Sequence, residues 1–143
     1  MLVINAPLGY FITMEPTILI VDDNPYDMEI TKIALEEVGC EVKLETAFRG
    51  KDALAYLREG QDLPSLILLD LKMPGMSGID TLRQIRADER LKHIPVIIVT
   101  SSSLEADEKE AYEAGANSFL HKAFSIDQFS GNLDDLLKRF LNN

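Results

Sequence analysis

The sequence predicts a doubly wound α/β domain, in which a parallel five-stranded sheet lies between two layers of helices. Strand-like and helix-like patterns alternate along the chain in a (βα)5 rhythm, without an internal repeat or a low-complexity linker. Several of the strand-like segments are continuous apolar runs, which are typical of parallel strands covered on both faces. The chain has 143 residues, the length of one ordinary domain. We therefore expect one three-layer sandwich.

Residues 1–16 precede this rhythm, and we expect a leader or arm of unknown role ahead of a domain at 17–143. Residues 1–13 are apolar and uncharged, but they lack the basic start of a secretory signal and are too short to span a bilayer. Met14 stands just before the first expected strand. The leader is therefore either an upstream start or an added arm, and neither export nor membrane insertion is indicated.

The first strand and helix carry clear start and stop signals. The apolar run 18–21 is followed by two carboxylates and then by Asn24, a favourable N-cap, and Pro25, which suits the first helical position. Gly39 follows the last apolar residue of this helix and indicates its end.

The remaining helices have similar punctuation, with glycine after the helix or serine before it. Serine caps the free N–H groups of a first turn, and a Glu or Gln three residues later completes a capping box. The expected signals are Gly60 and Gly115 after the second and fourth helices, Ser77, Ser102 and Ser125 before the third, fourth and fifth, and Glu105 and Gln128 as capping-box partners.

The composition of the five strands predicts their order in the sheet. The runs 18–21, 66–69 and 96–99 are continuously apolar and suit central positions. The run 42–45 alternates and the run 118–121 is short and mixed, so both belong at the edges. With the second and fifth strands outside, right-handed crossovers favour the order 2-1-3-4-5.

The charge of the chain limits its partners. Its 24 acidic residues outnumber its 14 basic ones, for a net charge of −10. This balance argues against a nucleic-acid backbone or an anionic membrane surface as the main partner, and favours cations or basic surfaces. The single cysteine, Cys40, cannot form an internal disulfide, so we interpret it as structural and expect a reducing, cytoplasmic location.

Three carboxylates are expected to meet at the point where the strand order reverses. Ligands of open α/β sheets bind there, beyond the carboxyl ends of the strands. Asp22 and Asp23 end the first strand and Asp70 ends the third. Two unit charges about 4 Å apart repel by roughly 4 kcal/mol at an effective dielectric near 20, which is enough to raise a pKa or to require a cation. Hard oxygen ligands select Mg²⁺, Mn²⁺ or Ca²⁺. Each acid alone could instead be a loop residue near a helix start, but three at neighbouring strand ends favour a cation site.

Two further polar groups end the next strands. Thr100 closes the fourth strand and Lys122 follows the fifth, so a hydroxyl and an ammonium point towards the same edge. Alone, Thr100 could be structural and Lys122 solvated. Beside a metal, both could bind the oxygens of a phosphoryl group.

Several stretches together resemble the motifs of response-regulator receiver domains of the CheY-like type, which have a flavodoxin-like fold. They are ILIVDDNP, LILLDLKMPGMSG, PVIIVTSSS and the late Lys122, and the resemblance runs from about Thr17 to the end of the chain. Within the family, YLREG, RLKHIPVIIVT and EAYEAGANSF are similar to single-domain regulators paired with phytochrome-type histidine kinases.

The resemblance implies a phosphorylation site. Asp70 would accept a phosphoryl group from a sensor histidine kinase. Asp23, Asp70 and the backbone carbonyl of Lys72 would bind Mg²⁺, with Mn²⁺ as a substitute, and Asp22 would assist through water. Lys72 also occupies a family position, together with Ser102, that tunes autodephosphorylation.

The resemblance assigns the other side of the pocket as well. Lys122 and Thr100 would hold the phosphoryl group, and Phe119 would be the aromatic switch residue of the fifth strand; Phe119 could otherwise merely fill an edge groove. Receivers usually follow the lysine with a proline in a cis bond, whereas this chain has Ala123. A non-proline cis bond costs about 3 kcal/mol, so this loop is either trans or strained.

The implied function is that of a switch and not of an enzyme. The regulator would signal by contact with a downstream protein, without an output domain, and Phe140 and Leu141 in the last helix either complete the core or extend a homodimer contact.

A degenerate receiver acting as a scaffold remains an alternative. A metal-dependent phosphatase of the haloacid-dehalogenase type normally needs a second Asp where this chain has Lys72, and a flavodoxin-like FMN binder would meet repulsion from Asp22 and Asp23.

Overall fold

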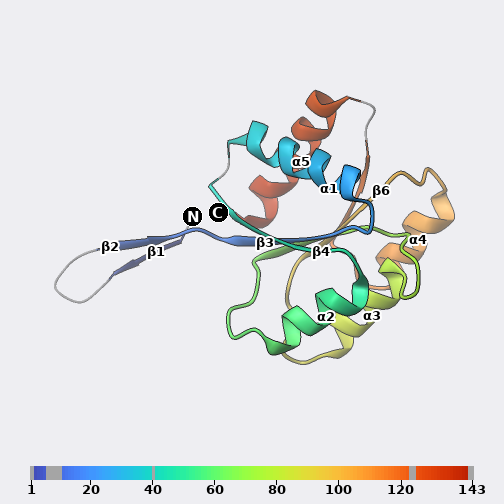
Figure 1. The fold of residues 1–143 in the computed structure, drawn as a ribbon, viewed down its shortest axis with the longest axis horizontal. Coiled ribbons are helices and arrows are strands. Elements are labelled where there is room, and N and C mark those ends of the chain that lie inside the picture. The colour runs from blue at the N-terminus through green and yellow to red at the C-terminus, as the bar shows by residue number, and fades with distance from the viewer. Residues whose placement is uncertain (1, 6–10, 40, 123–124, 142–143) are drawn as a thin grey trace.

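The computed structural model describes residues 2–5, 11–39, 41–122 and 125–141. Its main body is a three-layer sandwich around a parallel sheet in the order β4-β3-β5-β6-β7 (Figure 1). Counted from β3 as the first strand of the sheet, this is the predicted order 2-1-3-4-5, and the predicted fold class is confirmed. The strands of the sheet are β3 (Thr17–Val21), β4 (Lys43–Ala47), β5 (Leu66–Leu69), β6 (Val96–Thr100) and β7 (Ser118–His121).

Five helices cover the two faces of the sheet. On one face lie α1 (Pro25–Val38) and α5 (Ile126–Leu141), and on the other lie α2 (Gly50–Glu59), α3 (Gly78–Ala87) and α4 (Glu105–Glu113). Because side chains alternate along a strand, Ile18 and Ile20 pack with α1 and α5, whereas Leu19 and Val21 pack with the opposite helices. The central strands are therefore buried on both sides, which explains their continuous apolar sequences.

The edge strands also lie where the sequence placed them, with one shift in bounds. The second strand of the sheet, β4, spans Lys43–Ala47 and not the predicted 42–45. It pairs with β3 from Thr17 opposite Lys43 to Val21 opposite Ala47, so both strands end at the same level. The other edge strand, β7, has the predicted bounds.

The helix caps agree with the sequence at α1, α3 and α5. Asn24 accepts hydrogen bonds from the backbone N–H groups of Tyr26 and Asp27, and Gly39 ends α1 in the left-handed conformation at φ 74°. The Ser77 hydroxyl accepts from Asp80 N at 3.1 Å and that of Ser125 from Gln128 N at 3.1 Å.

The expected cap of α4 is wrong. The helix begins at Glu105 after Leu104, two residues later than a Ser102 cap requires, and its N-cap makes no side-chain hydrogen bond. Ser102 instead accepts from Leu104 N at 3.3 Å and donates its hydroxyl proton to Asp107. The serine therefore closes a turn before the helix, and Glu105 is the first helical residue and not the third.

The predicted arm contains a β-hairpin. Two antiparallel strands, β1 (Leu2–Asn5) and β2 (Phe11–Met14), form a two-stranded sheet of their own. The hairpin projects from the body beyond the amino end of β3 (Figure 1). These strands were not predicted, because residues 1–16 were assigned only as a leader or arm of unknown role. Within the described ranges, no helix combines the length and apolar content that a bilayer crossing requires.

Two other expectations concern the core. Phe140 and Leu141 pack against the core between the sheet and the α1–α5 layer, so their observed contacts are internal, and a homodimer contact through them stays a prediction. Cys40, interpreted as structural, lies outside the described residues.

Candidate functional site

The three predicted carboxylates meet at the carboxyl edge of the sheet. Asp22, Asp23 and Asp70 each offer one carboxylate oxygen, and these atoms all lie within 4.8 Å of one another. The backbone fixes two of them, because Asp22 N donates to Ala47 O at 3.1 Å and Asp70 N donates to Val21 O at 2.8 Å. Asp22 and Asp70 are buried and Asp23 is half-buried. The sheet itself therefore gathers the acid cluster.

The start of α3 packs tightly behind Asp70. A Cβ on Gly78 would lie 2.1 Å from the Asp70 carbonyl oxygen, so only glycine allows this approach. Gly78 N donates to Leu71 O at 2.9 Å and ties the helix to the loop that follows the strand. This contact holds the backbone of the predicted phospho-acceptor.

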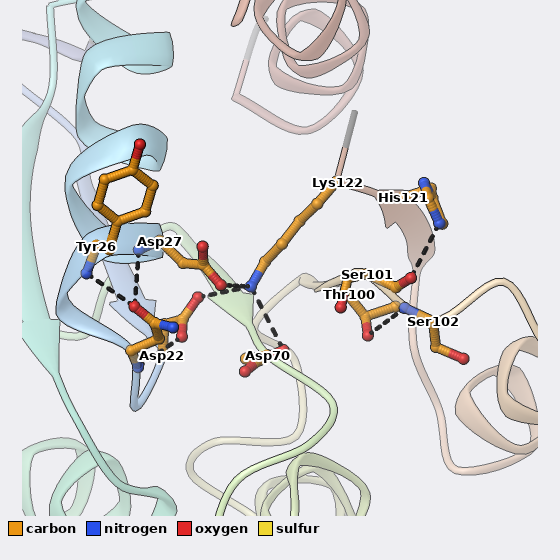
Figure 2. A network of polar contacts seen from close by, with 10 residues as sticks. Asp22, Tyr26, Asp27, Asp70, Thr100, Ser101, Ser102, His121 and Lys122 are labelled. Atoms are coloured by element: carbon orange, nitrogen blue, oxygen red, sulfur yellow. Dashed lines mark hydrogen bonds and ion pairs between the residues drawn. The ribbon is translucent and has the colours of Figure 1, made fainter. Parts of the chain in front are cut away.

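Lys122 lies among the carboxylates (Figure 2). Its Nζ is 3.0 Å from Asp22 Oδ2, 2.9 Å from Asp27 Oδ2 and 3.8 Å from Asp70 Oδ1. The Lys122 backbone N–H donates to Thr100 O at 2.7 Å, which extends the pairing of β7 with β6 to the edge of the site. The following residue, Ala123, lies outside the described residues, and so does the expectation about the Lys122–Ala123 bond.

The environment changes the protonation of both Asp70 and Lys122. Burial raises the pKa of Asp70 to about 7; Lys122 acts against this rise, whereas Asp22 and Asp23 add to it. Burial alone would lower the pKa of Lys122, but its hydrogen bonds to Asp27 and Asp22 outweigh burial and raise it. The lysine therefore remains charged, while Asp70 can hold a proton near neutral pH until another cation joins the cluster.

The predicted hydroxyl lies at the same edge but is directed to a neighbouring loop. Thr100 is buried at the end of β6, and its Oγ1 accepts from Ser102 N at 3.1 Å (Figure 2). Lys72, two residues after Asp70, has an exposed side chain whose Nζ is 3.6 Å from Asp107 Oδ2. Asp107 thus contacts both positions, Lys72 and Ser102, that were linked to autodephosphorylation.

Phe119 lies further back on β7, half-buried against the core that faces α2, α3 and α4. It is paired in register with Ile98 of β6, two residues before Thr100. The structure thus places Phe119 and Thr100 on adjacent strands, while their linkage as a switch stays a prediction.

Asp27 is the site residue that sequence reasoning missed. An acid in the first turn of a helix is expected only to favour the helix dipole. Its partner Lys122 is 95 residues away, so the contact requires the packed fold. The only signal in the sequence is its place in the first turn of the helix that follows Asp22 and Asp23.

The donor set suits a hard divalent cation. Carboxylate oxygens are preferred by Mg²⁺ and Mn²⁺, and a cation would stabilise the charged Asp70 carboxylate against the burial and the repulsion that raise its pKa. The described part of the site thus combines a carboxylate cluster that could bind a metal with one ammonium and one hydroxyl.

Comparison with known proteins agrees with this geometry. The family model for the response regulator receiver domain matches residues 18–134. The chain belongs to the receiver domain family. Receiver domains of this family are signalling switches of two-component systems, and the matched range contains the whole acid cluster, Thr100 and Lys122.

Similar proteins include a chemotaxis protein and two response regulators of known structure. The chemotaxis protein CheY-3 of Vibrio cholerae is 38% identical over 122 residues, which cover 85% of this chain and 92% of CheY-3. The phosphorylated cyanobacterial phytochrome response regulator RcpA superposes with a TM-score of 0.81 at 31% identity, covering 90% of this chain and 95% of RcpA. The Mn²⁺-bound form of the response regulator Rcp1 gives 0.76 at 29%, covering 86% and 92%.

Proposed function

We propose that this receiver is a phosphorylation-dependent response regulator that accepts a phosphoryl group on Asp70 from a sensor histidine kinase. One observation carries the proposal: the Asp70 carboxylate lies where two other carboxylates and the Lys122 ammonium converge. This combination suits in-line phosphoryl transfer, which depends chiefly on positioning and on neutralisation of charge.

The chemistry requires one bond to form and one to break. A carboxylate oxygen of Asp70 attacks the phosphorus of a phosphohistidine, and the nitrogen–phosphorus bond breaks with its electron pair going to the imidazole. A bound Mg²⁺ would neutralise charge on the transferring group. Asp23, Asp70 and the Lys72 carbonyl would hold the ion, and Asp22 would act through water.

The chain's own residues would hold the transferred group. Lys122 supplies N–H donors from its ammonium, 3.8 Å from the acceptor in the described state. Thr100 Oγ1 accepts one hydrogen bond from Ser102 N, which leaves its own proton to donate to a phosphoryl oxygen. Movement of Thr100 towards Asp70 would give Phe119 room to change rotamer, and this would bias the face formed by α4, β7 and α5 towards a downstream protein.

The cognate kinase is proposed to be of the phytochrome type. This proposal rests on the similarity to RcpA, whose description names it a phytochrome response regulator. Phosphotransfer rates from a set of candidate kinases would test it, and preference for a kinase of another class would contradict it.

Labelling with a small phosphodonor tests the acceptor. Incubation with acetyl phosphate and Mg²⁺ is expected to add one phosphoryl group, seen by intact-mass spectrometry. Asp70→Asn should abolish the product, because the nucleophilic carboxylate is gone, and chelation of the metal should reduce it strongly. Asp52→Asn makes the same chemical change at an exposed acid of α2 and should label normally.

The alternatives predict other results. Absence of a phosphoprotein with both small donors and kinases would favour a degenerate receiver that acts as a scaffold without phosphorylation. Continuous turnover of external phosphoesters would instead favour a metal-dependent phosphatase. Labelling that survives Asp70→Asn would overturn the assignment of the acceptor.

A further inference from the structure

The Lys122 ammonium has two close partners, and only one of them belongs to the predicted metal site. Its Nζ hydrogen-bonds Asp22 at 3.0 Å and Asp27 at 2.9 Å. The 3.8 Å distance to Asp70 Oδ1 is too long for a hydrogen bond. Asp27 is thus the shortest contact of the ammonium, although nothing in the proposed chemistry uses this carboxylate.

Asp27 is held rigidly enough to act on the lysine. It lies in the first turn of α1, where Pro25 fixes the backbone, and its N–H donates to the Asn24 side chain at 3.2 Å. Its side chain is 35% exposed, compared with 5% for Asp22. The carboxylate therefore lies at the outer side of the site and pulls the ammonium in that direction.

The packing around Lys122 leaves room for movement. A pocket of about 220 Å³ lies beside it, between the first turns of α1 and the residues Ile126 and Phe129 of α5. Among the described residues that line this pocket, Asp27 supplies the only carboxylate. Since the lysine stem borders open space, polar contacts and not close packing fix the place of its ammonium.

We propose that Asp27 is a positioning residue that holds the Lys122 ammonium away from Asp70 until a phosphoryl group draws it across. The inference rests on the proposed function. A phosphoryl group carries nearly two negative charges and three acceptor oxygens, whereas Asp27 offers one charge. Lys122 therefore changes partners on phosphorylation, and Asp27 weakens the binding of the phosphoryl group by competing for the ammonium.

Beryllofluoride, a tetrahedral mimic of the phosphoryl group, provides the test at equilibrium. In excess Mg²⁺, Asp27→Asn is expected to lower the half-saturating beryllofluoride concentration about fivefold, the effect of one partly exposed ion pair. Asp27→Ser, which also removes the charge, should act in the same direction. Glu29→Gln is the matched control, because Glu29 lies on the same helix and pairs with Lys32 at 3.3 Å.

The effect must pass through the lysine. In a Lys122→Met background, Asp27→Asn is expected to cause no change beyond that of Glu29→Gln. The ammonium resonance of Lys122, followed by nitrogen-15 NMR, should shift when wild-type protein binds beryllofluoride and should already be displaced in free Asp27→Asn.

The outcomes separate this inference from the proposed function. Binding by Asp27→Asn that equals Glu29→Gln, or is weaker than wild type, would overturn the inference while wild-type labelling upholds the function. An Asp27 effect that persists in Lys122→Met would also overturn it. Failure of wild type to bind beryllofluoride and to be labelled would remove the proposed function and the inference together.

Discussion

Asp70 shows that gathering the acids of a site into a buried cluster destabilises the folded protein. The residue is buried at the end of β5, and its pKa is raised from 3.8 to about 7, first by burial and then by Asp22 and Asp23 despite the opposing effect of Lys122. Above about pH 7 the folded protein must carry a charge that the unfolded chain holds more easily. The cluster thus opposes folding until a cation binds.

The stability difference between wild type and Asp70→Asn should therefore depend on pH. With a chelator present, we expect Asp70→Asn to be more stable at pH 8 by about 4 kcal/mol, because the asparagine carries no buried charge. As pH falls through about 7, folded wild type takes up a proton, and the penalty is fully lost below the unfolded value of 3.8. Urea unfolding at pH 4 and pH 8 measures the difference, and equal values at both would contradict the prediction.

The sequence reveals the acids of the site more readily than it reveals their partners. Asp22, Asp23 and Asp70 could be predicted to meet, because they follow two strands that the predicted sheet order places side by side. Asp27 could not, because its contact with Lys122 depends on how α1 and the end of β7 pack, and helical periodicity alone does not set that distance.

At the scale of elements, Arg86 joins α3 to two other segments. Its Nε donates to Gly115 O at 2.9 Å, and its guanidinium nitrogens donate to Ile94 O at 2.8 Å and Asn117 Oδ1 at 2.8 Å. Asn117 Oδ1 also accepts from Val96 N at 2.8 Å. The side chain therefore links the helix, the start of β6 and the loop after α4.

Arg86→Met should destabilise the fold by about 2 kcal/mol, because it leaves several half-buried acceptors without their donors. Arg86→Lys should not restore stability, since an ammonium lacks the planar fork. Arg83→Met on the same helix removes only exposed ion pairs, at 3.6 Å to Asp80 and 3.9 Å to Glu110, and should change stability little. Comparable losses at both positions in urea unfolding would show that the guanidinium network is not responsible.

Capping signals predicted the start of a helix correctly where the capping side chain had no other nearby partner. Ser77 caps α3 as expected, because its hydroxyl has the first turn as its near partner. Ser102 does not cap α4, because its hydroxyl oxygen accepts from Leu104 N and the chain makes another turn before the helix. A capping pattern does not show where such a turn delays the start of a helix.

At the scale of the whole molecule, the two-stranded hairpin and the five-stranded sheet of the sandwich are separate sheets. Both cores are formed by residues from Ile18 to Leu137, with Phe140 and Leu141 packed against one of them. The hairpin was not predicted, although residues rich in β-formers flank a segment with Pro7 and Gly9, which is a recognised hairpin signal. The leader was interpreted from its apolar composition and length alone, so this hairpin signal was not used.

Deletion of residues 1–14 is expected to leave the sandwich folded. We expect a change in unfolding free energy below about 1 kcal/mol and unchanged labelling of Asp70, because the central sheet keeps all its pairings. Urea unfolding and the acetyl phosphate assay measure both quantities. Loss of folding on deletion would show that the hairpin supports the core.

The projecting hairpin also determines how the protein can be handled. It leaves the sheet at the amino end of β3, whereas Asp22 and Asp70 follow the carboxyl ends of their strands (Figure 1). A strand of five residues separates the two edges by about 16 Å. A surface or fluorophore attached through residues 1–14 would thus face away from the acids, so an immobilised molecule would still present its phospho-acceptor to a kinase in solution.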